Sequence, residues 1–226
     1  MNYSTIIVAG GKGLRMQSDL PKQFMKLAGK PILIHTIEAF LRAFEQEIVV
    51  VMNKEYRSHW QKEVECFGLE KKILTVNGGK TRFHSVKNGL AAIGLTKGVV
   101  GVHDAVRPFV SADFLRQMYA TAQEKKAVVP AIPLKSSIRK LREEGTSKAV
   151  NRANYRLIQT PQCFQLELLK KAYEQPYQSH FTDDASVVEA MKQRIELVEG
   201  LEENIKITTP IDFEWAKILV SKKVQG

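Results

Sequence analysis

The stretch TIIVAGG at residues 5–11 decides the fold of this chain. Its first five residues form a short apolar and β-branched run, which is typical of a strand buried in a parallel sheet. The two glycines that follow end the strand. Because they carry no Cβ, they let the backbone come close to a ligand. We therefore expect a buried strand that leads directly into a ligand-binding loop.

Strand-like and helix-like segments alternate along most of the chain. Apolar runs predict strands, and apolar residues at helical spacing predict helices. Strands are predicted at 47–52, 71–76, 99–103 and 127–132, and helices at 31–44, 85–93 and 113–125. This alternation predicts an α/β fold with a mainly parallel sheet, organised as a single domain over residues 1–226.

Several loops follow directly on predicted strands. In open α/β sheets, ligands bind beyond the carboxyl ends of the strands. The loops at 9–16, 77–82 and 104–108 are therefore expected to converge on one site.

The segment 133–155 breaks the alternation. It is polar and basic, and residues 136–146 are typical of a hairpin. A two-stranded ribbon has little core of its own and is marginally stable alone. Two interpretations stay open, a mobile loop or an arm that packs on another subunit, and the second is preferred.

The charge of the chain favours anionic ligands over nucleic acid or membrane. The formal net charge is +10, which fits either a basic surface or an anionic partner. No long run of Lys and Arg is present, and aromatic residues are not interleaved with basic ones, so nucleic acid is not expected as a partner. No segment reaches the roughly 20 apolar residues that span a bilayer, so no membrane association is expected.

Cysteine usage points to a reducing compartment. The chain has two cysteines, Cys66 and Cys163, far apart and without metal-ligand spacing. A disulfide framework or a zinc site is therefore not expected. The first residues show no charged stretch followed by a long apolar one, and we expect a cytoplasmic protein.

The first candidate motif is AGGKGLRM at residues 9–16, followed by LPKQ at 20–23. Its glycines match neither the Walker A pattern nor a clean G-x-G-x-x-G, and a tight turn alone would explain them. Arg15 and Lys22 favour a ligand. A guanidinium fork and an ammonium beside a backbone cradle suit a triphosphate, although either side chain is also compatible with solvated surface charge.

Two further motifs follow later strands. In NGGKTRFHS at 77–85, Ser85 either bonds a base or caps the next helix, and His84 is interpreted as structural rather than catalytic. In VHDAVRP at 102–108, Asp104 is placed to bind a hydroxyl or a phosphate-bound divalent metal. An internal pair of Asp104 with Arg107 is the alternative.

Two residues nearer the end of the chain are also candidates. Thr182 in FTDDAS is predicted to be a helix N-cap with carboxylates in the first turn. Lys206 is a single charge among apolar, strand-like neighbours, and a surface-facing edge residue is the plain interpretation of it.

The motifs taken together resemble one family. In chain order they are AGGKGLRM with PKQ, GGKTRFHSV, VHDAVRP, TPQCF, TDDAS and VEG with NIKITTP. This set resembles the 2-C-methyl-D-erythritol 4-phosphate cytidylyltransferases of the non-mevalonate isoprenoid pathway, over essentially the whole chain. The resemblance implies a Rossmann-like nucleotidyltransferase fold with a β-arm at 133–155 exchanged in a homodimer. It also implies Mg²⁺ and a reaction between CTP and a polyol phosphate, 2-C-methyl-D-erythritol 4-phosphate, that gives 4-diphosphocytidyl-2-C-methyl-D-erythritol and pyrophosphate.

The resemblance implies a role for each matching residue. Transition-state stabilisation is implied for Arg15 and Lys22, and positioning of the sugar phosphate for Lys206 and for Arg152 of the partner's arm. CTP binding is implied for Ala9, Gly10, Gly79 and Ser85, and the loop glycines Gly11 and Gly13 are expected to join them. Contacts with the polyol phosphate are implied for Asp104, Arg107, Thr160 and Thr182. Asp104 is expected to face both substrates and is the candidate metal ligand.

The chain departs from the family pattern at two places. Lys80 stands where an acidic residue is common, and Ser136-Ser137 where Asp-Thr is common. The rival interpretation is a cytidylyltransferase for ribitol 5-phosphate or another alditol phosphate, which shares the glycine loop, PKQ and the His-Asp turn. A non-catalytic nucleotide-binding module is a second rival, but intact Arg15, Lys22, Arg152 and Lys206 argue against it.

Overall fold

The structure of the chain is a computed structural model that describes residues 2–11, 21–46 and 48–224. Its centre is an eight-stranded sheet with the order β10-β7-β11-β6-β1-β4-β5, in which β12 also pairs with β7. The strands are β1 (Tyr3–Ala9), β4 (Ile48–Met52), β5 (Ile73–Asn77), β6 (Val99–Asp104), β7 (Ala127–Pro133), β10 (Arg156–Ile158), β11 (Gln162–Gln165) and β12 (Glu196–Glu199).

The sheet is mainly parallel, as the sequence predicts. β1 pairs in parallel with β4 and β6, and β4 pairs in parallel with β5. The exceptions come from the later part of the chain, where β11 runs antiparallel between β6 and β7, and β10 runs antiparallel to β7. Every strand predicted from an apolar run is present, whereas the short β10, β11 and β12 were not predicted.

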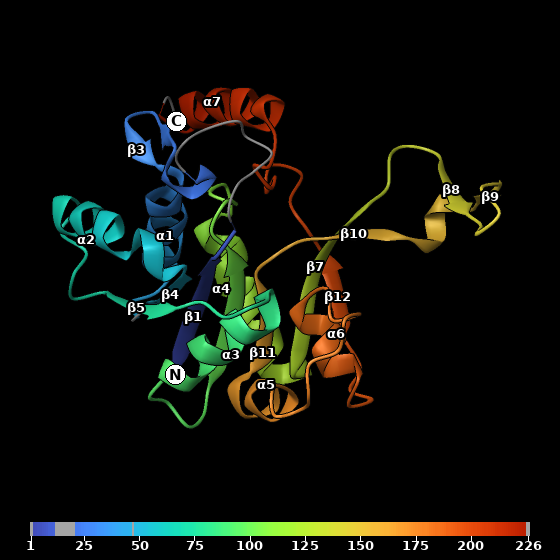
Figure 1. Cartoon of the computed structure of the whole chain (residues 1–226), viewed down its shortest axis with the longest axis horizontal. Helices are drawn as coiled ribbons and strands as arrows, with labels where there is room; N and C mark the ends of the chain where they lie inside the picture. The colour runs from blue at the N-terminus through green and yellow to red at the C-terminus, as the bar shows by residue number, and fades with distance from the viewer. Residues whose placement is uncertain (1, 12–20, 47, 225–226) are drawn as a thin grey trace.

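Helices cover both faces of the sheet (Figure 1). They are α1 (Ile32–Ala43), α2 (Arg57–Cys66), α3 (Arg82–Ala92), α4 (Ala112–Lys125), α5 (Leu166–Ala172), α6 (Asp184–Glu189) and α7 (Pro210–Val224). Ile7 of β1 packs in one core cluster with residues of α1 and α4. Its neighbour Ile6 packs in a second cluster with residues of α3, α5 and α6. Strand β1 is therefore buried on both faces, which confirms the interpretation of the opening stretch.

Two predicted helix starts are wrong. Helix α3 begins at Arg82, three residues before the predicted start, and its N-cap is Thr81. Ser85 lies inside the helix, so its interpretation as a cap fails. Helix α6 is capped by Asp183, not by Thr182, and Asp183 forms a capping box with Ser186. A carboxylate one residue further along accepts the helix N–H in place of the threonine hydroxyl.

The segment 133–155 contains the predicted hairpin. Strands β8 (Ile138–Leu141) and β9 (Ser147–Val150) form a two-stranded sheet that stands clear of the body of the molecule (Figure 1). At its turn, Gly145 has a φ of 82°, a value that favours glycine. Leu141, at the tip, is 77% exposed. The function of the hairpin as a dimerisation element stays a prediction.

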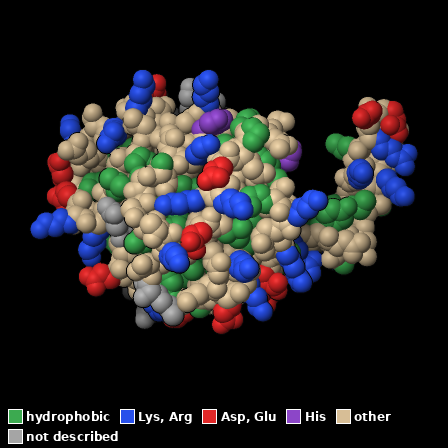
Figure 2. All heavy atoms as spheres, turned by 90° about the horizontal axis from the view of Figure 1, so that it is seen from below, with side chains coloured by type: hydrophobic (Ala, Val, Ile, Leu, Met, Phe, Trp, Pro, Cys, Tyr) green, Lys and Arg blue, Asp and Glu red, His purple; other side chains and the backbone are tan. Residues whose placement is uncertain are grey.

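Charged side chains are mixed on the face seen in Figure 2. Lys and Arg alternate there with Asp and Glu and with apolar side chains, and no single basic patch covers this face. Among the helices in the described part of the chain, none is long and apolar enough to cross a membrane.

The packing between β6 and α4 gives the first prediction. A Cβ at Gly101 would lie 2.3 Å from the Tyr119 Oη. That hydroxyl is buried, bonds the Thr5 Oγ1 at 2.7 Å and donates to the Ser4 carbonyl at 3.0 Å. We expect Gly101→Ala to lower the free energy of unfolding by about 1–3 kcal/mol, because the added methyl group overpacks the core. Urea denaturation measures the loss.

Gly94→Ala is the matched control, because a Cβ at this position meets no atom within 4 Å. We expect its free energy of unfolding to stay close to that of the unmodified chain. Equal stability of the two alanine variants would contradict the packing of Tyr119 against β6.

Candidate active site

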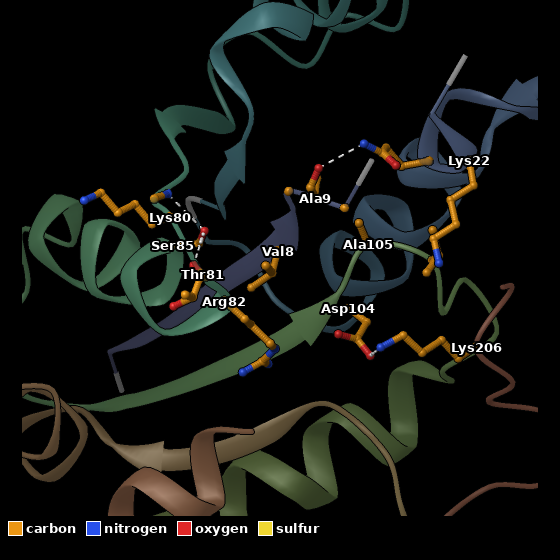
Figure 3. Close-up of a pocket in the computed structure, with 15 residues that line it drawn as sticks. Val8, Ala9, Lys22, Lys80, Thr81, Arg82, Ser85, Asp104, Ala105 and Lys206 are labelled. Atoms are coloured by element: carbon orange, nitrogen blue, oxygen red, sulfur yellow. Dashed lines mark hydrogen bonds and ion pairs between the residues drawn. The ribbon is translucent and has the colours of Figure 1, made fainter. Parts of the chain in front are cut away.

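A cavity of about 310 Å³ lies at the carboxyl ends of β1 and β6 (Figure 3). Its walls come from the described parts of the three loops that the sequence predicts to converge, and from the segments that carry Lys22 with Gln23 and Lys206. The lining residues are Val8, Ala9, Gly10, Gly11, Lys22, Gln23, Gly79, Lys80, Thr81, Arg82, Ser85, Asp104, Ala105, Val106 and Lys206.

Most of the predicted site residues meet in this cavity. The structure brings together Ala9, Gly10, Gly11, Lys22, Gly79, Ser85, Asp104 and Lys206. Arg15 and Gly13 lie outside the described residues. Because these positions come from segments far apart in the sequence, the fold itself assembles the candidate site.

Four predicted residues do not line the cavity. Arg107 and Thr160 lie behind Asp104. The Arg107 Nε donates to the Asp104 carboxylate, and the Thr160 Oγ1 accepts the Asp104 backbone N–H. Thr182 is exposed just before α6. Arg152 lies at the end of the arm, is exposed, and donates from Nη1 to the Lys135 carbonyl. The described chain therefore does not bring Arg152 to its own cavity.

Asp104 ends β6 and is the centre of an ion cluster. Its Oδ2 lies 2.9 Å from the Lys206 Nζ and 3.2 Å from the Arg107 Nε. Burial opposes ionisation of this carboxyl, but Lys206, Arg82 and Arg107 outweigh burial and hold its pKa well below the usual range. Asp104 is therefore an ionised acceptor that faces the cavity.

Lys206 is not an edge-strand residue. It lies in the irregular segment that leads to α7, and its side chain extends to Asp104 (Figure 3). The segment is held in place by backbone and side-chain bonds. Ile207 donates to the Val106 carbonyl, and Arg107 donates from Nη1 to the Asn204 carbonyl. The plain interpretation of Lys206 is thus wrong, because a distant loop returns to the end of β6.

His103 supports Asp104 from inside the protein. Its Nδ1 lies 3.1 Å from the Thr160 Oγ1, and its Nε2 lies 3.0 Å from the Arg107 carbonyl oxygen. The Thr160 Oγ1 also accepts the Asp104 backbone N–H. Thr160 therefore donates its proton to Nδ1, and Nε2–H donates to the carbonyl, as in a neutral ring. Burial lowers the pKa of His103 to about 4.

The glycine pair before α3 shapes the opposite wall. A Cβ at Gly79 would lie 2.3 Å from the His84 Cβ, so this position requires glycine. The Gly79 N–H donates to the Ser85 Oγ at 3.1 Å, and Ser85 donates to the Thr81 carbonyl at 3.0 Å. His84 bonds the Thr81 Oγ1 through Nδ1 and does not line the cavity, which agrees with its structural interpretation.

Sequence reasoning missed Arg82 and Gln23. The Gln23 Nε2 donates to the Ala9 carbonyl at 2.9 Å and ties the PKQ segment to the end of β1. Arg82 pairs with Asp184 at 2.6 Å and points into the cavity (Figure 3). Both residues lie inside quoted motifs, but a single sequence carries no signal that pairs Arg82 with a carboxylate so far along the chain.

The described residues offer one acidic side chain to a metal in the cavity, Asp104. Among them, no group of three or more His, Cys, Asp or Glu residues is placed to hold a metal ion. Mg²⁺ commonly binds through one or two carboxylates together with substrate phosphates and water. The donor set therefore fits a metal that arrives with a phosphorylated substrate.

The mainly parallel sheet, with glycines and cations at its carboxyl edge, defines an α/β protein of the nucleotidyltransferase class. Residues 3–222 match the family described as 2-C-methyl-D-erythritol 4-phosphate cytidylyltransferase. The chain belongs to this family.

Relatives and solved structures agree with the family match. Proteins with the family's name in Bacteroides thetaiotaomicron and Bacteroides fragilis are 50% and 51% identical, each over 97% of this chain and 100% of the relative. The crystal structure of the Francisella tularensis enzyme of that name has a TM-score of 0.81 and 34% identity, over 97% of this chain and 100% of that one. The crystal structure of the Thermus thermophilus enzyme has a TM-score of 0.76 and 31% identity, over 98% of this chain and 100% of that one.

The buried His103 gives a pH prediction. The folded pKa is about 4, whereas an unfolded histidine has a pKa near ~6.5, so the unfolded chain takes up the proton first as the pH falls. The stability that His103 contributes is therefore fully present above about pH 6.5 and is lost toward pH 4. The expected loss is about 3 kcal/mol, at ~1.4 kcal/mol for each pH unit between the two pKa values.

The measurement is denaturant unfolding at several pH values, in the unmodified chain and in His103→Gln. Because the pKa of His35 is lowered as well, only the difference between the two proteins reports on His103. The variant is expected to show a flatter slope between pH 4 and pH 6.5. Parallel slopes in the two proteins would refute the neutral buried ring.

Proposed function

We propose that this chain transfers the cytidylyl group of CTP to 2-C-methyl-D-erythritol 4-phosphate. The products are 4-diphosphocytidyl-2-C-methyl-D-erythritol and pyrophosphate. The observation that carries this proposal is the cavity in which Lys22, Lys206 and the ionised Asp104 meet two glycine loops, in a member of this family. Ribitol 5-phosphate is the acceptor against which the proposal is tested.

The chemistry needs position and charge more than it needs a base. A phosphate oxygen of the acceptor attacks the α-phosphorus of CTP, and the bond from that phosphorus to the bridging oxygen breaks. Pyrophosphate leaves with the electron pair. Because a phosphate oxygen is already ionised near neutral pH, no proton must be removed. Among the described lining residues there is no histidine, which agrees with a reaction that uses no general base.

The cations of the cavity offset the repulsion between two anionic substrates. Lys22 lines the cavity together with Gly10 and Gly11, where backbone N–H groups can approach the triphosphate. Lys206 pairs with the Asp104 carboxylate and suits the phosphate of the acceptor (Figure 3). The Asp104 carboxylate faces the cavity next to Lys206 and can accept hydrogen bonds from substrate hydroxyls. Arg15 is assigned to the triphosphate by its match to the family motif.

A divalent cation, Mg²⁺, is proposed as the cofactor. Asp104 is the residue that would help to hold it, next to the phosphates of CTP. The ion would neutralise the negative charge that develops on the pyrophosphate as it leaves.

A homodimer is proposed to complete the site. Arg152 is exposed on the arm, bonds there to the Lys135 carbonyl, and does not line the cavity of its own chain. Arg152 can therefore contribute to catalysis only in the cavity of another subunit. Exposed apolar side chains along the arm and the adjoining sheet edge support a subunit contact. They are Leu141, Tyr155, Leu157, Ile158 and Leu197.

A cytoplasmic location is proposed from the chemistry of the chain. Cys66 and Cys163 are both free thiols, as expected in a reducing compartment. Small phosphorylated ligands, rather than nucleic acid or membrane, are proposed as partners of the chain, because Lys22 and Lys206 line one cavity.

The activity prediction uses pyrophosphate release. The unmodified chain is expected to release pyrophosphate from CTP with 2-C-methyl-D-erythritol 4-phosphate, and far less with ribitol 5-phosphate. Lys22→Ala is expected to lower kcat about 10²–10³-fold, because it removes a preorganised cation from the transition state. Preference for ribitol 5-phosphate would overturn the acceptor, and near-normal kcat in Lys22→Ala would overturn the assigned role.

Mixing two inactive variants tests the shared site. Arg152→Ala and Lys206→Ala homodimers are each expected to be nearly inactive. In a mixed dimer, one site carries both changes and the other carries neither. Co-refolding equal amounts should therefore restore about a quarter of the normal activity, since half of the dimers are mixed and each has one intact site. If the mixture stays as inactive as its parents, Arg152 does not act across subunits.

A further inference from the structure

Arg82 is a cation of the cavity to which neither the sequence motifs nor the family resemblance gives a role. It is the first residue of α3, and its side chain extends from the helix into the cavity, toward Asp104 (Figure 3). A positive charge at a helix N-terminus is opposed by the helix dipole. Its presence there therefore needs a compensating interaction.

A buried carboxylate supplies that interaction. The Arg82 Nη2 donates to the Asp184 Oδ2 at 2.6 Å, and the Tyr173 Oη donates to the Asp184 Oδ1 at the same distance. The Asp184 side chain is 0% exposed, whereas that of Arg82 is 27% exposed. Burial opposes the charge of Arg82, but Asp184 outweighs burial and raises its pKa above the usual value.

The segment that carries Asp184 is itself fixed to the sheet. The Gln162 Nε2 of β11 donates to the Asp183 Oδ2 at 2.7 Å, and the Gln162 Oε1 accepts the Ala185 N–H at 2.8 Å. The guanidinium is therefore held from a rigid part of the molecule. A fully buried carboxylate such as Asp184 is costly unless a cation pairs with it, so this pair is better explained as a means of orienting Arg82 than as packing.

Arg82 and Lys206 lie on opposite sides of the Asp104 carboxylate (Figure 3). A guanidinium has five N–H donors, so a bond to one carboxylate oxygen leaves donors for a second anion. Arg82 is tied to the segment that follows Thr182, and it lies across the Asp104 carboxylate from Lys22 (Figure 3). The position of Arg82 thus corresponds to the acceptor rather than to the triphosphate.

We propose that Arg82 binds the phosphate of the acceptor together with Lys206, and that Asp184 is the positioning residue that aims it. This inference rests on the proposed function, because it takes a polyol phosphate as the acceptor. The guanidinium fork matches two oxygens of a phosphate monoester, which an ammonium group does not. Arg82 sets the affinity for the acceptor and leaves the affinity for CTP unchanged.

Steady-state kinetics with each substrate varied in turn tests whether Arg82 binds the acceptor. Arg82→Gln is expected to raise KM for 2-C-methyl-D-erythritol 4-phosphate at least 10-fold and to change KM for CTP by less than about 2-fold. Arg82→Lys is expected to recover part of the loss, because it keeps the charge but not the fork. Asp184→Asn should raise the same KM by a smaller factor, because it keeps the shape but releases the guanidinium.

Lys87→Gln is the matched control. Lys87 is exposed on the same helix and does not line the cavity, so this variant loses one charge with no expected change in either KM. Thermal unfolding checks that each variant is folded, and Arg82→Lys replaces Arg82→Gln if the latter does not fold. Calorimetric titration of the acceptor into the CTP-free protein gives a second readout when turnover is too slow for kinetics.

The outcomes separate the two proposals. An unmodified chain that is inactive with this acceptor overturns the proposed function and the role of Arg82 with it. An active chain in which Arg82→Gln leaves KM for the acceptor unchanged, raises only KM for CTP, or raises both equally overturns the role of Arg82 alone.

Discussion

The rest of the site depends on the ionised Asp104 at the end of β6. A buried carboxylate is costly unless cations and hydrogen bonds surround it. Here Lys206 and Arg107 pair with it, and Arg82 adds to the field that keeps it charged. Each cation comes from a different part of the chain. The requirement to neutralise one carboxylate therefore draws the 104–107 turn, the start of α3 and the segment before α7 around one cavity.

The residues behind Asp104 hold it in position and do not themselves react. His103, Thr160 and Asn204 form a buried network behind it, in which the Asn204 Nδ2 donates to the Thr160 carbonyl at 2.8 Å. The ring of His103 stays neutral because burial lowers its pKa. Such preorganisation suits phosphoryl transfer, where the protein supplies position and charge and the substrates supply the reacting oxygens. An arginine from a partner's arm would add a cation that the single chain does not bring to its cavity.

Sequence patterns predicted the parts of this structure that depend on local signals. The run that contains Ile6 and Ile7 predicted a strand buried on both faces, and the glycine loops predicted where the ligand site would lie. Features set by tertiary contacts were not predicted. Lys206 has strand-like neighbours in the sequence but pairs with Asp104. The N-cap of α6 is Asp183 and not Thr182. The pair of Arg82 with Asp184 joins residues 102 positions apart. The residue types were visible, but their partners follow from the fold.

The central claim is that two anionic substrates react with each other in this cavity. Phosphorus NMR of the chain with CTP, 2-C-methyl-D-erythritol 4-phosphate and Mg²⁺ tests it most directly. The account predicts that CTP disappears while pyrophosphate and two coupled diphosphate signals rise in equal amounts. Unchanged CTP, or its hydrolysis to CMP and pyrophosphate without coupled diphosphate signals, would contradict it.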